Sequence, residues 1–305
     1  MYDMEKTAAG AGTEIRKIRK TDPEYPPVLL LYERMPAVLY SRGSLPDPER
    51  KSVAIVGARN CTAYGKREAV RFAAVLAENG VQIISGLALG VDSWAHAGAL
   101  EAGGTTIAVL GSGVDVCYPQ SHTALYGKIL ESGGGILSEY EPGMPAFPHH
   151  FPVRNRIISA LADIVLVVEA RKKSGSLITA SYALEQGKSI YAVPGRNGDP
   201  LSEGCNRLIA DGAGVAWEPE ILMEELGIRY GKAKGGKRGE SRLPARLLRD
   251  REAVCVHDHL TSDNKNLSGL AEETGLSVPA VSRALIQLCL AGCASGDPGS
   301  GYIRT

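Results

Sequence analysis

A repeated alternation of short apolar runs with longer helical stretches is the feature that most constrains how this chain can fold. Each run is rich in Val and Ile and is followed by a Gly or Pro break. The runs lie at residues 53–56, 81–85, 106–110, 136–138, 164–169 and 189–193. Strands that are apolar on both faces and alternate with helices are typical of a parallel sheet covered by helices. The pattern therefore predicts a doubly wound, mostly parallel α/β domain.

The remaining sequence divides around this domain. Residues 1–22 lack apolar periodicity, and we expect a flexible N-terminal tail there. Residues 23–50 alternate prolines with apolar pairs, which favours an extended lead segment over a regular element, and we assign it to a domain spanning 23–227. Lys and Arg then dominate residues 228–252, where we predict a basic flexible linker.

Residues 253–305 have the pattern of a small C-terminal winged-helix domain. Within the stretch LAEETGLSVPAVSRALIQL, a first helix is followed by a turn at Gly275, an N-cap at Ser277 and a second helix. The Gly-rich tail ASGDPGSGYIRT would form the wing. A second helix of this kind usually reads duplex DNA, but here its exposed side offers one strong base, Arg283. We therefore favour a protein contact or a structural role over duplex recognition.

Composition excludes several classes of protein. The formal net charge is +0, so a polyanionic partner would have to be held by local patches. The six cysteines form no CxxC pair and no signal peptide precedes them, which indicates reduced thiols and a cytoplasmic protein. No apolar run approaches the roughly 20 residues that span a bilayer. His149, His150, His257 and His259 lack partners at ligand spacing, so we expect no metal site.

The loops at the carboxyl ends of the predicted strands carry the chemistry, because ligands of doubly wound sheets bind there. These loops are GARNCTAYG, SGLALGVD, GSGVDVCYPQSH and ARKKSGSLITA. Their glycines expose backbone N–H groups near helix starts, a setting that suits phosphate. In a single loop, the tight turn between strand and helix would explain the glycines better than a ligand would. Four such loops beside Arg59, Lys172, Lys173 and the arginines of FPVRNR favour a phosphate-rich ligand. We expect FPVRNR, residues 151–156, to be a loop just ahead of a short helical turn that leads into the strand at 164–169.

No nucleotide cofactor is indicated. The first strand is followed by neither GxGxxG nor a Walker A pattern, since GARNCTAYGK has the wrong spacing. The GKS triplet at 187–189 precedes a predicted strand instead of a helix, and Tyr182 stands where the required glycine would be. ATP hydrolysis and ordinary dinucleotide binding are therefore unsupported.

Seven collinear motifs resemble a known family. They are SVAIVGARNCTAYG, SGLALGVDSWAH, GSGVDVCYPQSH, GGILSEYEPG, FPVRNRIISALA, SGSLITASYALEQG and AVPGRNGDPLSEGCNRLIADGA. In this order they resemble the bacterial DNA-processing protein A family, also called DprA or Smf, over about residues 23–217. Members bind single-stranded DNA through an extended Rossmann-like domain, dimerise through it and load the RecA recombinase onto incoming DNA during natural transformation.

The resemblance implies a single-stranded DNA-binding protein without catalytic residues or cofactor, whose partners are DNA, RecA and a second copy of the chain. Arg59, Arg154, Asn155 and Arg156 would bind phosphates, and Phe151 could stack on a base, a pairing suited to sequence-tolerant binding. Ser174, Gly175 and Ser176 would add donors at a helix start. The full candidate set is Gly57, Arg59, Ser85, Gly86, Gln120, Phe151, Arg154, Asn155, Arg156, Ser174, Gly175 and Ser176.

The sequence departs from the family pattern at a few positions. Ala58 replaces the usual Ser, Val91 an Ile and Ala160 a Gly, and Gln120 stands in a loop that often carries Lys. Many members also carry an N-terminal helical SAM-like domain. This chain offers barely twenty residues there, so we expect that domain's function to be absent.

Two alternatives belong to other classes. The architecture is also similar to nucleotide N-glycoside hydrolases of the lysine-decarboxylase-like group, which have a PGGxGTxxE signature. Aligning Thr179 with the signature threonine puts Tyr182 at the catalytic glutamate position, with Glu185 almost one helical turn further on, which argues against hydrolysis. A winged-helix transcription regulator with a sensor domain would instead bind duplex DNA tightly and with sequence specificity.

Overall fold

The structure, a computed structural model, describes residues 14–228, 247, 250–261, 264–297 and 301–304. The chain divides into two compact units between residues 230 and 231. Each unit is described by itself below.

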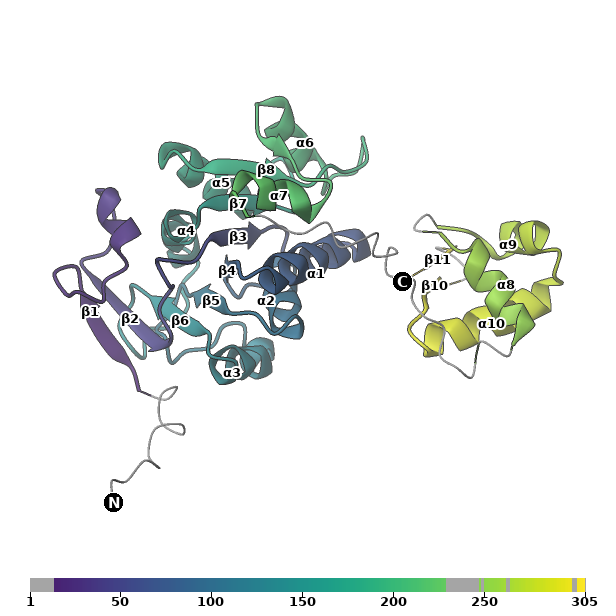
Figure 1. Cartoon of the computed structure of the whole chain (residues 1–305), viewed down its shortest axis with the longest axis horizontal. Helices are drawn as coiled ribbons and strands as arrows, with labels where there is room; N and C mark the ends of the chain where they lie inside the picture. Colours follow the sequence, from purple (N-terminus) through teal and green to yellow (C-terminus); the bar gives the residue numbers. More distant parts are fainter. Residues whose placement is uncertain (1–13, 229–246, 248–249, 262–263, 298–300, 305) are drawn as a thin grey trace, which may run out of the picture. The chain divides into compact units, whose positions relative to one another are not determined.

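The first unit is built on one large sheet. Within the described residues it has nine strands in the order β1-β2-β6-β5-β4-β3-β7-β8-β9 (Figure 1). Their bounds are β1 (Arg16–Arg19), β2 (Val38–Gly43), β3 (Ser52–Val56), β4 (Gln82–Ser85), β5 (Thr106–Val109), β6 (Gly135–Ser138), β7 (Ile164–Val167), β8 (Ser189–Ala192) and β9 (Gly214–Val215). Strands β3 to β9 are parallel, while β1 and β2 add an antiparallel edge beside β6. The predicted doubly wound, mostly parallel sheet is confirmed.

Helices cover both faces of this sheet (Figure 1). Their bounds are η1 (Pro27–Leu31), α1 (Ala63–Glu78), α2 (Val91–Glu101), η2 (Gln120–His122), α3 (Thr123–Glu131), α4 (His150–Leu161), α5 (Gly175–Glu185), α6 (Glu203–Ala210) and α7 (Pro219–Glu225). Successive side chains of a strand point to opposite faces. In β3, Val53 and Ile55 pack with residues of α1, α2 and α7, whereas Ala54 and Val56 pack with residues of α4, α5 and η1. Burial on both faces explains the continuous apolar runs in the sequence.

The strand order reverses beside β3. Strands β4, β5 and β6 continue the sheet on one side of β3, and β7, β8 and β9 continue it on the other. Helix α4 connects the two halves: it follows β6, packs against β5, β4 and β3, and leads into β7. In a doubly wound sheet, this reversal point is where the crevice for a ligand opens at the carboxyl ends of the strands.

The prediction of a flexible tail over residues 1–22 is wrong for β1, which pairs with β2 in register from Arg16 to Arg19. Residues 1–13 lie outside the described part. The strand escaped prediction because only Ile18 of its four residues is buried, so no periodicity appears in the sequence. Strand β2 and η1 likewise occupy the lead segment 23–50, where an irregular extended chain was expected.

The segment 151–156 also differs from its prediction. It was expected ahead of a short helical turn, but it lies inside α4, which begins at His150. Pro152 is tolerated there because the first turn of a helix does not use its backbone N–H groups. The two arginines are therefore placed by a helix and not by a loop.

The second unit contains three helices and a hairpin within the described residues. They are α8 (Arg251–His259), α9 (Leu267–Thr274), α10 (Val278–Leu290), β10 (Ala294–Asp297) and β11 (Gly301–Arg304). Gly275 ends α9 in the left-handed conformation, and Leu270 packs with Val281 and Leu285 of α10. These are the elements expected of a winged-helix unit, an assignment that stays a prediction. Residues 229–246 and 248–249 of the predicted linker lie outside the described part, and Arg251 and Glu252 belong to α8.

The described residues contain neither a membrane-spanning helix nor a cluster of metal ligands. No helix there is long and apolar enough to cross a membrane. No group of three or more His, Cys, Asp or Glu side chains is placed to hold a metal ion.

Candidate functional site

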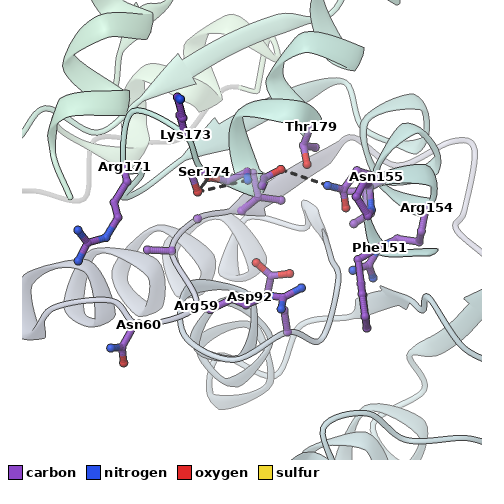
Figure 2. A pocket seen from close by; sticks show the side chains of 18 of the residues that line it. Arg59, Asn60, Asp92, Phe151, Arg154, Asn155, Arg171, Lys173, Ser174 and Thr179 are labelled. Carbon is purple, nitrogen blue, oxygen red and sulfur yellow. Dashed lines mark hydrogen bonds between the residues drawn. The ribbon is translucent and has the colours of Figure 1, made fainter. Parts of the chain in front are cut away.

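A pocket of about 460 Å³ opens where the strand order reverses (Figure 2). The connections after β3, β4 and β7 and the start of α4 supply most of its lining, and Pro148 before α4 and Leu201 after β8 complete it. The polar and aromatic side chains in its lining are Arg59, Asn60, Asp92, Phe151, Arg154, Asn155, Arg171, Lys173, Ser174, Ser176 and Thr179. The loop pattern predicted a ligand site at this edge of the sheet, and the structure has a pocket there.

Arg154 forms the inner wall of the pocket and is buried, with 3% of its surface exposed. Its Nη1 donates to the carbonyl of Gly86 at 2.9 Å and also to the carbonyl of Val109, so it joins α4 to the ends of β4 and β5. Burial lowers the pKa of Arg154 to about 10, and the nearby Asp92 carboxylate opposes that shift. Because this guanidinium donates its hydrogen bonds to backbone carbonyls, its main role in the structure is to position α4.

Asp92 lies opposite this guanidinium, at the start of α2. Its Oδ2 accepts from the backbone N–H of Gly86 at 3.1 Å. Burial raises the pKa of Asp92, and the charge of Arg154 opposes the rise. A Cβ on Gly86 would stand 2.7 Å from both Nη atoms of Arg154 and from Oδ2 of Asp92. Glycine is required here because the two charged groups close in on its Cα.

Three exposed cations stand around the mouth of the pocket: Arg59, Arg171 and Lys173. None of them makes an ion pair with another described residue, whereas the neighbouring Lys172 lies 3.5 Å from Glu203. In Figure 2, Arg171 and Lys173 lie on the connection after β7, across the pocket from Phe151. The Arg59 guanidinium carbon lies 5.1 Å from the centre of the Phe151 ring, within cation–π range.

The start of α5 closes the remaining side. Ser174 is its N-cap, and the Ser174 Oγ accepts from the backbone N–H of Ser176 and lies 2.8 Å from the Ser176 Oγ. Asn155 donates from Nδ2 to the Gly175 carbonyl at 3.2 Å, which ties α4 to this helix start. The unpaired N–H groups and the dipole of a helix N-terminus favour an anion. Cationic side chains and a helix start therefore face one cavity.

Eight of the twelve candidate residues line the pocket and four do not. Those in the lining are Gly57, Arg59, Phe151, Arg154, Asn155, Ser174, Gly175 and Ser176. Outside it, Ser85 is buried and donates to the Ile55 carbonyl, Gly86 lies behind the Arg154 side chain, and Gln120 is exposed on η2. Arg156 instead makes two hydrogen bonds to Glu139, at 2.9 and 2.7 Å. The assignment of all twelve residues to DNA binding stays a prediction.

Sequence reasoning left five polar residues of the lining out of the candidate set: Asn60, Asp92, Arg171, Lys173 and Thr179. Each lies in one of the four loop segments that mark the carboxyl ends of the strands. Asn60 directly follows Arg59, and Arg171 lies in the connection after β7. Treating every polar residue of those loops as a candidate would have found all five.

A doubly wound sheet with a cationic pocket and a helix start at its reversal point defines an α/β domain that binds a phosphate-bearing ligand. Comparison of the sequence with known protein families identifies one family within this class. The model of DNA recombination-mediator protein A matches residues 16–227, and the chain belongs to this family.

Relatives and solved structures agree with that assignment. The chain is 40% identical over 284 residues to Protein Smf of Escherichia coli, covering 92% of this chain and 75% of that protein. DNA processing protein DprA of Streptococcus pneumoniae is 41% identical over 63% of this chain and 67% of that protein. The X-ray structure of S. pneumoniae DprA has a TM-score of 0.66 at 38% identity, covering 72% of this chain and 77% of that one.

A structure of DNA processing protein A from Helicobacter pylori, reported for its single-stranded DNA binding mode, has a TM-score of 0.61 at 31% identity. That comparison covers 72% of this chain and 98% of the H. pylori chain.

The burial of Arg154 gives a prediction about stability. Arg154→Ala would leave the Gly86 and Val109 carbonyls and the Asp92 carboxylate without their buried partner. We expect the free energy of unfolding, measured by urea denaturation, to fall by about 3–5 kcal/mol. Arg59→Ala removes an exposed arginine from the same pocket and should change it by less than about 0.5 kcal/mol. Equal stability of the two variants would contradict a positioning role for Arg154.

Proposed function

We propose that this chain binds single-stranded DNA in the pocket at the strand reversal point. The observation that carries the proposal is the set of exposed cations, Arg59, Arg171 and Lys173, around the Phe151 ring and the start of α5. Binding of single strands without sequence preference needs a cationic surface that follows the backbone and an aromatic ring on which a base can stack. The H. pylori relative, described by its single-stranded DNA binding mode, supports this choice among phosphate-bearing ligands.

The division of charge within the pocket also supports DNA binding. The net charge of the chain is +0, so attraction to a polyanion must come from a local surface. Among the described residues that line the pocket, Asp92 is the one carboxylate, and its side chain is buried and faces Arg154. An incoming phosphate therefore meets the exposed cations before it meets a negative charge.

Removing the exposed cations should weaken DNA binding in a salt-dependent manner. We expect an Arg59→Ala/Arg171→Ala/Lys173→Ala variant to bind fluorescent oligo-dT more weakly than the wild type. Each lost phosphate contact removes about 0.7 from the log–log slope of affinity against salt, so the slope should flatten by about 2. Fluorescence anisotropy across a salt series measures both quantities.

A variant with the same loss of charge elsewhere is the control. Arg34, Lys128 and Arg207 are exposed in the same unit and do not line the pocket. When all three are replaced by Ala, the slope of affinity against salt should stay within about 0.7 of the wild-type value, the change expected for one phosphate contact. Equal flattening in both triple variants would show that net charge, and not the pocket, governs binding.

We also propose that the chain has no turnover of its own. Glu185, the carboxylate nearest in sequence to the hydrolase glutamate position, is the last residue of α5, whereas the pocket contacts the first residues of that helix. At 1.5 Å per residue, Glu185 lies about 15 Å along the axis from Gly175. Release of free base from a nucleoside monophosphate would contradict this proposal.

The second unit gives little support to the transcription-regulator alternative. On α10, Val278, Ile286 and Leu290 are exposed, and Arg283 is within 3.3 Å of Glu252. A helix that reads duplex DNA needs cations and polar side chains on its outer face. Tight binding to one duplex sequence in competition with random duplex would favour the regulator instead.

We further propose that the first unit forms a homodimer. Two leucines of this unit are largely exposed: Leu31 of η1 is 75% exposed and Leu184 of α5 is 73% exposed. The Tyr32 hydroxyl donates to the Gln186 carbonyl and so connects the chain after η1 to the chain after α5. Large apolar side chains that stay exposed are candidates for an interaction surface, and we assign these two leucines to the dimer contact.

A single charge in this cluster should disrupt the dimer. Leu184→Glu would place a carboxylate in the contact, and we expect light scattering to give the mass of one chain where the wild type gives two. Leu290→Glu makes the same change on α10 of the second unit and should leave the mass unchanged. A dimeric Leu184→Glu variant, or a monomeric wild type, would contradict this interface.

Loading of the RecA recombinase onto DNA is the final part of the proposal, and we place it in the cytoplasm, where that recombinase acts. Its support is membership of a family described as recombination mediators. The protein should accelerate RecA assembly on single strands coated with single-stranded DNA-binding protein. An unchanged lag before RecA assembly would contradict it.

A further inference from the structure

Two exposed aromatic rings lie beside the pocket. Tyr118 is 48% exposed and Phe147 is 42% exposed, whereas a third exposed ring, Trp217 at 60%, has no contact with the pocket lining among the described residues. Tyr118 and Phe147 both neighbour residues that contact or line the pocket. Leaving large apolar rings in water is unfavourable, and clusters of them mark sites that bind a partner.

Tyr118 extends the aromatic surface that begins inside the pocket. Its ring centre lies 5.5 Å from that of Phe151, at an interplanar angle of 39°. Arg59 approaches the same Phe151 ring, so Tyr118 and Arg59 both contact the ring that lines the pocket. Phe151 itself packs closely on Gly111, where a Cβ would stand 3.0 Å from the ring.

Phe147 extends the surface along the chain segment before α4. Its ring is stacked with His149, with centres 5.7 Å apart, and meets the edge of His150 at 5.2 Å. His150 is buried, stacks on Tyr140 and has its Nδ1 3.0 Å from the Gly111 carbonyl, so this group is held in place. Pro148, between Phe147 and His149, lines the pocket itself.

We propose that Tyr118, Phe147 and His149, here called the aromatic ledge, bind the bases of the strand that continues out of the pocket. The inference rests on the proposed single-stranded DNA binding and extends that site by at least one nucleotide. The occupant is identified by continuity with the pocket and by chemistry: every base has a face that can stack on an aromatic ring. The site then consists of a cationic part that holds phosphates and an aromatic part that holds bases.

The two parts differ in how they respond to salt. Phosphate contacts release counterions and make affinity fall as salt rises, whereas stacking on a neutral ring releases none. Removing rings of the ledge should therefore lower affinity while leaving the salt slope unchanged. This signature separates the ledge from the cations at the pocket mouth.

The experiment measures oligo-dT binding by Tyr118→Ala, Phe147→Ala and the double variant across a salt series. We expect each single variant to bind about five- to a hundredfold more weakly, the range for loss of one stacked base, with an unchanged slope. Tyr118→Phe keeps a ring and should bind like the wild type. Trp217→Ala removes an exposed ring outside the pocket lining and should also have no effect.

Oligonucleotides with one abasic position moved along the strand test the contact directly. In the wild type, an abasic site over the ledge should cost about as much affinity as the Tyr118→Ala or Phe147→Ala change. In the double variant the same abasic site should cost nothing more. Variants that bind like the wild type, or that lose affinity with a flatter salt slope, would overturn the ledge while leaving the pocket intact. A wild type that ignores oligo-dT would instead refute the proposed function itself.

Discussion

The pair of hydrogen bonds from the Arg154 guanidinium to the Gly86 and Val109 carbonyls is the interaction on which the rest of the site depends. Helix α4 crosses from β6 to β7 over the sheet, and these bonds fix its first turns against the ends of β4 and β5. Phe151 lies one turn earlier on α4, and Asn155 is the next residue. A buried cation that bonds to backbone therefore determines where an aromatic ring and an amide face the ligand.

Two kinds of cation follow from this arrangement. Arg154 is held by carbonyls and stays charged despite a pKa lowered by burial, because about 10 is still far above neutral pH. Arg59, Arg171 and Lys173 remain in water and keep their hydrogen-bonding capacity for a partner. Mixing the two kinds in one pocket gives a rigid wall and an adaptable mouth, which suits the proposed binding of a flexible polyanion.

The sequence predicted the sheet well, because all six apolar runs became strands and the ligand loops lie at one edge. It was less informative about FPVRNR. Taken as a loop, the segment made Arg154 and Arg156 appear equivalent, but residues two apart on a helix point in different directions. Arg154 accordingly points into the sheet ends, and Arg156 turns to Glu139. Strand β1 could not be predicted because it buries Ile18 alone, and its stability comes from pairing with β2, which no local pattern records.

The crossover by α4 also has a consequence for folding kinetics. The pocket joins residues from Val56 to Leu201, so its walls are distant in sequence and meet only when parallel strands have paired on both sides of β3. Contacts of this kind form slowly, since a long loop must be closed before any of them stabilises the chain. A nascent chain that has emerged only through β6 has the connections after β3 and β4 but neither α4 nor the start of α5. The binding surface is thus completed late, when the second half of the sheet is added.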